Sequence, residues 1–152
     1  MRIAFIGGGH MTTSLIGGLR SGGLPAGDIV VADPVAGQLE RLRQEFGVHG
    51  THDNGAAATG ADLVVLAVKP QDMATAARSL AAVAGDGRRV VLSIAAGIRI
   101  ANLATWLGGH VPLVRAMPNR PALIGAGISA ACAGPGVSET ERARAEWVLA
   151  AA

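Results

Sequence analysis

The sequence is poor in aromatic residues: it has two Phe, two Trp and no Tyr among 152 residues, although half of them are hydrophobic. Its core must therefore be built from Ala, Val, Leu and Ile, with glycine where elements approach closely. This composition is typical of helices packed on a buried parallel sheet. A chain of this length buries roughly 70% of the surface that it exposes when unfolded, which is enough for one well-packed domain.

Cysteine, long apolar runs and basic clusters are scarce as well, and each scarcity argues against a class of protein. Cys132 is the only cysteine, so an internal disulfide is impossible and we expect a cytoplasmic protein. No apolar run reaches the length of a signal-peptide core or a membrane span. The net charge is only +2 and the arginines are scattered, which argues against nucleic-acid binding. His49 and His52 lack a third ligand, so no metal site is expected.

Short β-rich runs alternate with longer helical runs along the chain. We predict strands over residues 2–7, 28–33, 62–68, 88–94, 111–117 and 127–132, and helices over 11–22, 36–46, 54–59, 71–84, 100–107 and from 138 onward. The run 62–68 is apolar without alternation, as in a strand that is buried on both faces. Repeated β–α–β order implies right-handed crossovers, so we predict an α/β fold of the Rossmann type. Its sheet is expected to be doubly wound and mostly parallel, with helices on both faces.

The last predicted helix has a clear start and no clear end. Ser138 and Glu141 form a capping-box pattern, in which each side chain accepts the other residue's backbone N–H. The helical run then passes through Trp147 and Leu149 into three alanines, without Gly, Asn or Pro to end it. We therefore expect its apolar side chains to stay uncovered, as at the cut end of a longer chain.

A glycine-rich loop, Gly7–Thr12, follows the first predicted strand and opens the first predicted helix, which is the context of the dinucleotide-binding fingerprint. Gly7 permits the tight turn, and Gly9 lets the backbone approach a pyrophosphate. The helix N-terminus offers free N–H groups and a partial positive charge to the phosphates. Thr12 stands where glycine or alanine allows the closest packing, so we expect a slightly displaced helix. A glycine-rich turn without a ligand is the alternative.

Asp33 ends the second predicted strand, at the place where an acidic residue accepts hydrogen bonds from an adenosine ribose. Its carboxylate would repel a 2′-phosphate and so favour NAD over NADP. Asp33 and Pro34 are equally suited to starting a turn without touching a ligand. Both interpretations stay open at this point.

Four segments resemble, in the same order, those of the pyrroline-5-carboxylate reductases. They are Phe5–Met11, Ala67–Gln71, Ser93–Gly97 and Arg115–Asn119. The resemblance covers essentially the whole chain. It implies reduction of the cyclic imine 1-pyrroline-5-carboxylate to L-proline by NADPH or NADH, the last step of proline biosynthesis, with hydride going to the C=N carbon and a proton to the nitrogen.

The resemblance also implies an organisation for the enzyme. Residues 1–152 would be its NAD(P)-binding Rossmann domain. The family's C-terminal helical domain, which carries substrate contacts and the homo-oligomer interface, is absent from this chain. The isolated chain is then expected to be inactive, and its catalytic residues are unknown.

The roles that the resemblance assigns are all contacts with the cofactor. The residues are Gly7, Gly9, His10 and Met11 at the pyrophosphate, Asn54 near the adenosine ribose, where strand position had already placed Asp33, and Ala67, Val68, Lys69, Pro70, Ala95, Ala96 and Asn119 on the nicotinamide side. Lys69 is the only lysine in the chain, and a flexible ammonium at the end of a strand can reach hydroxyls or phosphates of the cofactor. Arg120 replaces a threonine of the family, and its role is open.

Two alternatives to this reductase remain. Another two-domain enzyme, similar to 6-phosphogluconate or 3-hydroxyisobutyrate dehydrogenase, would also begin with such a domain but lacks the Met-Pro-Asn segment at Met117–Asn119. A non-catalytic NAD(P)-sensing module is the second alternative, because a fold does not settle a function.

Overall fold

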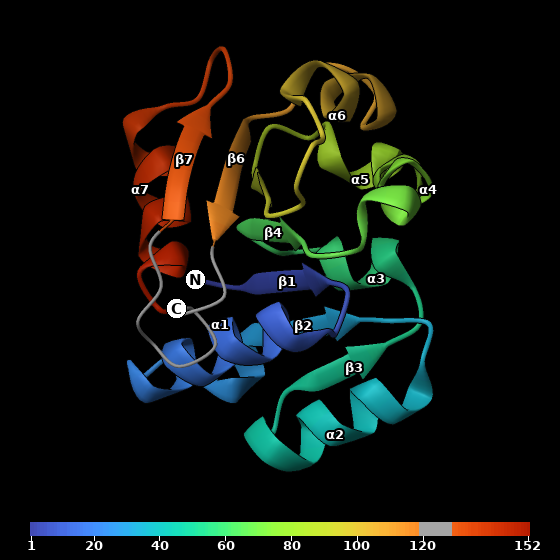
Figure 1. The fold of residues 1–152 in the computed structure, drawn as a ribbon, viewed down its shortest axis with the longest axis vertical. Helices are drawn as coiled ribbons and strands as arrows, with labels where there is room; N and C mark the ends of the chain where they lie inside the picture. Colours follow the sequence, from blue (N-terminus) through green and yellow to red (C-terminus); the bar gives the residue numbers. More distant parts are fainter. Residues whose placement is uncertain (119–128) are drawn as a thin grey trace.

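The computed structural model describes residues 1–118 and 129–152, and these form a seven-stranded sheet with helices on both faces (Figure 1). The strands are β1 (Ile3–Ile6), β2 (Ile29–Ala32), β3 (His49–Thr51), β4 (Leu63–Leu66), β5 (Val90–Ser93), β6 (Leu113–Pro118) and β7 (Ser129–Ala133). Their order in the sheet is β3-β2-β1-β4-β5-β6-β7. All neighbours are parallel except β6 and β7. The predicted Rossmann-type fold is confirmed.

Seven α-helices cover the two faces of the sheet in the described part of the chain. They are α1 (His10–Ser21), α2 (Ala36–Phe46), α3 (Asn54–Ala58), α4 (Met73–Ser79), α5 (Ala81–Ala84), α6 (Ile100–Trp106) and α7 (Glu139–Leu149), with 3-10 turns at Ala26–Asp28 and Pro70–Asp72. Ile3 and Phe5 of β1 face the core formed with α1, α2 and α7. Ala4 and Ile6 face the core formed with α3 to α6. None of these helices is long and apolar enough to cross a membrane.

Two elements differ from the sequence prediction. β3 was not predicted, because it is three residues long, largely exposed and carries no apolar run; only its parallel pairing with β2 makes it a strand. The helix predicted over residues 71–84 is divided into the 3-10 turn, α4 and α5. At the second division the N–H of Leu80 donates to the carbonyl of Ala77, three residues back, while the Leu80 side chain is buried.

The last helix begins as predicted but is better covered than predicted. Ser138 Oγ accepts the Glu141 N–H at 3.2 Å, and Glu141 Oε2 accepts the Ser138 N–H at 2.8 Å. Leu149 is buried in the core that α7 shares with α1, so its expected exposure was wrong. A Cβ on Gly18 of α1 would collide with the Ala151 carbonyl, which shows how closely the chain approaches α1 there. Trp147 is exposed, as expected.

Replacing Ser138 by alanine is expected to lower the free energy of unfolding of residues 1–152 by about 1 kcal/mol, because the Glu141 N–H loses its acceptor. Urea denaturation followed by circular dichroism measures the change. Thr140→Ala, at an exposed position in the same turn, is the matched control and should change stability by less than about 0.5 kcal/mol. Equal losses from both substitutions would show that the cap does not stabilise α7.

Candidate functional site

A cleft of about 570 Å³ lies at the carboxyl ends of β1, β2 and β4. Its walls are formed by the residues that follow these strands, together with parts of α2, α3 and α4. From β1 the chain adds β2 and β3 on one side and β4 to β7 on the other, so the strand order switches direction between β1 and β4. Ligands of open α/β sheets bind at such switch points. Of the residues predicted to bind a cofactor, the cleft brings together Gly7, Gly9, Asp33, Asn54, Ala67, Val68 and Lys69.

The glycine loop is held between the ends of two strands. The N–H of Gly7 donates to the carbonyl of Ala32 at 2.8 Å, and the N–H of Ala67 donates to that of Ile6 at 2.8 Å. Gly7 has φ +104°, and a Cβ there would lie 2.7 Å from the Ala67 carbonyl oxygen. Both the backbone angle and the close approach therefore require glycine at this position.

Gly9 presents an open side to the cleft. A Cβ at Gly9 would meet no atom of residues 1–118 or 129–152 within 4 Å. Gly9 is also the N-cap of α1, which has no acidic residue in its first turn and no side-chain cap among the described residues. The first N–H groups of this 12-residue helix, with the positive end of its dipole, are therefore available to an anion. This arrangement fits a pyrophosphate.

Thr12, at the third position of the fingerprint, ties the helix to the loop. Its side chain is buried, and its Oγ1 donates to the Gly7 carbonyl at 2.6 Å. The sequence predicted only a steric cost for threonine here. The hydrogen bond shows that the hydroxyl also contributes an attractive contact to the base of the loop.

Asp33 connects the loop to the start of α2. Its Oδ2 accepts the Gly8 N–H at 2.7 Å, and its Oδ1 accepts the Val35 N–H at 2.8 Å. The second bond is the side-chain turn that the Asp33-Pro34 pair suggested. Asp33 is half-buried and also lines the cleft, so a turn role and a ligand role are compatible.

Asn54 and Lys69 are two further polar residues of the cleft. Asn54 opens α3, and its Nδ2 donates to Ser79 Oγ of α4 at 3.0 Å, which links two walls of the cleft. Lys69 follows β4 and is exposed. Its backbone carbonyl accepts the Asp72 N–H at 3.0 Å in the turn that leads to α4. The lysine therefore comes from an ordered turn, while its ammonium is solvated.

The remaining predicted residues lie outside the lining of the cleft. His10 and Pro70 are next in sequence to the lining residues Gly9 and Lys69, and Met11 is one residue further along; none of the three lines the cleft itself. Ala95 and Ala96 follow β5, and the Ile94 N–H donates to the Leu66 carbonyl at 3.1 Å, so both alanines share the carboxyl edge with the cleft. Asn119 and Arg120 lie outside the described residues.

The polar lining residues that were not predicted are Gln38, His52, Asp72, Thr75 and Ser79. Gln38 is in the first turn of the helix that follows Asp33, and this position could have indicated it. His52 follows β3, so missing that strand also hid the histidine. Ser79 lies far from the glycine loop in sequence, and only the packing of α4 beside α3 brings it to the cleft.

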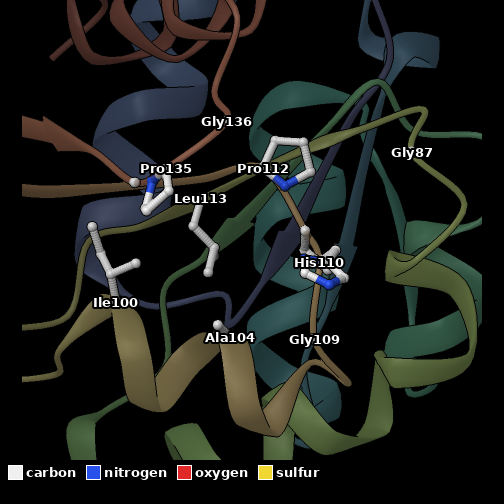
Figure 2. Close-up of a pocket in the computed structure, with 11 residues that line it drawn as sticks. Gly87, Ile100, Ala104, Gly109, His110, Pro112, Leu113, Pro135 and Gly136 are labelled. Atoms are coloured by element: carbon white, nitrogen blue, oxygen red, sulfur yellow. The ribbon is translucent and has the colours of Figure 1, made fainter.

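A second hollow, of about 400 Å³, lies at the opposite edge of the sheet (Figure 2). It is bounded by Ile100 and Ala104 of α6, by the segment that leads into β6, and by Pro135 after β7. His110 is the one titratable side chain among its described lining residues. Because its described lining residues include no Asp, Glu, Lys or Arg, it is a weaker candidate for a chemical site.

The open glycine loop, the free N-terminus of α1 and the switch point define a dinucleotide-binding domain of the Rossmann class. Residues 2–97 match the model of the family described as NADP oxidoreductase coenzyme F420-dependent, and the chain belongs to this family. The resemblance to pyrroline-5-carboxylate reductases, inferred from four motifs, is also confirmed by comparison with known proteins.

The similarity to individual relatives extends over nearly the whole chain. The chain is 45% identical over 150 residues to the pyrroline-5-carboxylate reductase of Pseudomonas aeruginosa, covering 99% of this chain and 55% of the relative. The pyrroline-5-carboxylate reductase of Coxiella burnetii superposes with a TM-score of 0.96 at 34% identity, covering 99% of this chain and 56% of that one. A Plasmodium falciparum pyrroline carboxylate reductase with NADP bound, 21% identical, has a TM-score of 0.85 and shares the fold; the match covers 99% of this chain and 55% of that one. The chain thus spans about half the length of the curated relatives it matches.

Proposed function

We propose that this chain is the cofactor-binding part of an NAD(P)H-dependent reductase that converts 1-pyrroline-5-carboxylate to L-proline, in the last step of proline biosynthesis. The observation that carries the proposal is the cleft at the switch point, where Gly9 and the free N-terminus of α1 leave space for a pyrophosphate. The identity to the Pseudomonas aeruginosa enzyme supports the choice of substrate. A cytoplasmic location and a homo-oligomer formed through a C-terminal helical domain belong to the same proposal.

The residues of the cleft can be assigned to parts of a dinucleotide. Gly7 and Gly9 would hold the pyrophosphate, and Asp33 with Asn54 would lie by the adenosine. Val68 and the other residues after β4 would contact the nicotinamide half. When bound, the reduced nicotinamide would supply the hydride for the C=N carbon. The described residues themselves bind and orient the cofactor, whereas the groups that hold the imine belong, in this proposal, to the other half of the enzyme.

Isothermal titration of residues 1–152 with NADH and with NADPH tests the proposal. Saturable binding of at least one of them with 1:1 stoichiometry is the expected result. Failure of both cofactors to bind to the folded chain would contradict it, because the loop would then be a glycine-rich turn without a ligand.

Replacing Lys69 by alanine is expected to weaken binding of the preferred cofactor modestly. The lysine is exposed, and an exposed ion pair contributes at most about 1 kcal/mol, so the Kd should rise by no more than about fivefold. The same titration measures the effect at low and high salt, and the effect should shrink as salt rises. Arg88→Ala is the matched control, since it removes one exposed positive charge just before β5, at the opposite edge of the sheet. An equal rise in Kd for both variants would indicate a general effect of charge.

A further inference from the structure

We infer that the β2 end of the cleft selects NAD(H) over NADP(H), and that Asp33 is the specificity-determining residue. The inference rests on the proposed function, because it presumes that the cleft binds a dinucleotide. The two cofactors differ by one phosphate on the adenosine ribose. The groups around the end of β2 therefore decide between them.

The Asp33 carboxylate is held in place by the backbone on both of its oxygens. Gly8 donates to Oδ2 and Val35 to Oδ1, at 2.7 and 2.8 Å. Each carboxylate oxygen can accept more than one hydrogen bond, so these contacts leave capacity for the two hydroxyls of an unphosphorylated ribose. A side chain fixed by two bonds cannot swing away from a 2′-phosphate without losing both of them. The carboxylate is thus held in position at this end of the cleft.

The same carboxylate lies next to the start of α2. Val35 is the N-cap of this 11-residue helix, and its N–H is the donor to Asp33 Oδ1. Helix N-termini commonly bind phosphates, because their free N–H groups and the positive end of the helix dipole attract an anion. Here the Asp33 carboxylate already binds the Val35 N–H, so a 2′-phosphate that approached the start of α2 would meet a like charge.

Arg41, the arginine nearest this end of the cleft in α2, is engaged by other side chains. Arg41 lies one turn beyond Gln38 on α2, and its Nη2 donates to Gln38 Oε1 and Thr13 Oγ1, both at 3.0 Å. Its Nη1 lies 3.6 Å from Glu45 Oε2. Lys69 follows β4, and β1 lies between β4 and β2 in the sheet. The backbones of β4 and β2 are therefore about 10 Å apart, which is two strand-to-strand spacings.

His52 also offers an acceptor to this end of the cleft in its neutral form. Its Nδ1 lies 2.8 Å from the Asp33 backbone carbonyl. A carbonyl oxygen only accepts, so Nδ1 carries the proton and Nε2 is the acceptor of the neutral ring. An acceptor suits a ribose hydroxyl and repels a phosphate oxygen.

The test is a pair of titrations, with NADH and NADPH, of the unchanged chain, Asp33→Ser and Asp33→Asn. The unchanged chain should bind NADH at least about tenfold more tightly, as expected for a charge-assisted hydrogen bond that only one cofactor can make. Both variants should narrow the ratio of the two Kd values to about threefold or less. If Asp33 only braced the loop, both cofactors would weaken by the same factor and the ratio would not move. Thermal unfolding of each variant checks its fold, and Asp33→Asn keeps the shape of the side chain.

Asp72→Ser is the matched control, because it removes an exposed carboxylate of the same cleft from the β4 side. Its ratio of Kd values should equal that of the unchanged chain; a shift as large as that of Asp33→Ser would overturn the inference. Equal affinity of the unchanged chain for both cofactors, or tighter NADPH, would overturn it alone and leave the proposed function standing. If neither cofactor bound, the inference about Asp33 and the proposed function would both be contradicted.

Discussion

Residues 1–152 are expected to bind the dinucleotide and yet to reduce 1-pyrroline-5-carboxylate at a rate below detection. Hydride transfer requires the imine carbon to be held about 3–3.5 Å from the donor, and such orientation contributes about 7–11 kcal/mol. Losing it corresponds to a fall of roughly five to eight orders of magnitude in rate. The described residues line the cleft beside the sheet, and the chain spans about half the length of its curated relatives. We therefore expect the groups that hold the substrate to lie in the other half.

The assay is oxidation of NADH or NADPH in the presence of the imine, with the full-length Pseudomonas aeruginosa enzyme as the positive control. Titration of the same sample with cofactor shows whether missing turnover reflects missing binding. Turnover comparable to that of the control enzyme would show that the substrate site is complete within these residues. That result would contradict the proposal that this chain binds the cofactor while the other half of the enzyme holds the substrate.

Gly9→Val is expected to raise the Kd of the preferred cofactor at least about 100-fold, or about 2.7 kcal/mol. Gly9 has φ −76°, which valine can adopt, and its Cβ direction is free of described protein atoms, so the fold should be preserved. The added side chain would instead occupy the space of the pyrophosphate. Gly7 would be a poorer test, because a Cβ there collides with the Ala67 carbonyl and would disturb the fold itself.

Isothermal titration measures the loss, and circular dichroism verifies that the variant is folded. Gly27→Val is the matched control: Gly27 also has free space in its Cβ direction within the described chain, but it lies in the 3-10 turn before β2, away from the cleft. The Gly27→Val variant should bind the cofactor with the same Kd as the unchanged chain. If Gly9→Val bound as tightly as the unchanged chain, the glycine loop would not be the phosphate site.

The motifs of the cleft were predictable because each follows a strand that could be recognised locally. The apolar runs that became β1, β2 and β4 placed Gly7, Asp33 and Lys69 at strand ends, and parallel strands bring their carboxyl ends to one edge. β3 had no such run, so neither this strand nor His52 after it was found. The hydrogen bond from Gly8 to Asp33 joins residues 25 positions apart, and no local pattern indicates it.

The sequence by itself determined the order of the strands other than β3, the start of α7 and the edge of the sheet at which a dinucleotide would bind. These properties follow from hydrophobic periodicity, from capping residues and from the single hand of β–α–β crossovers, all of which act over short stretches of chain. Only the tertiary structure decided that Leu149 is covered by α1 and that both oxygens of Asp33 are engaged by backbone N–H groups. The burial of a side chain and the partners of a carboxylate depend on elements that are distant in sequence and meet only when the two layers of helices pack on the sheet.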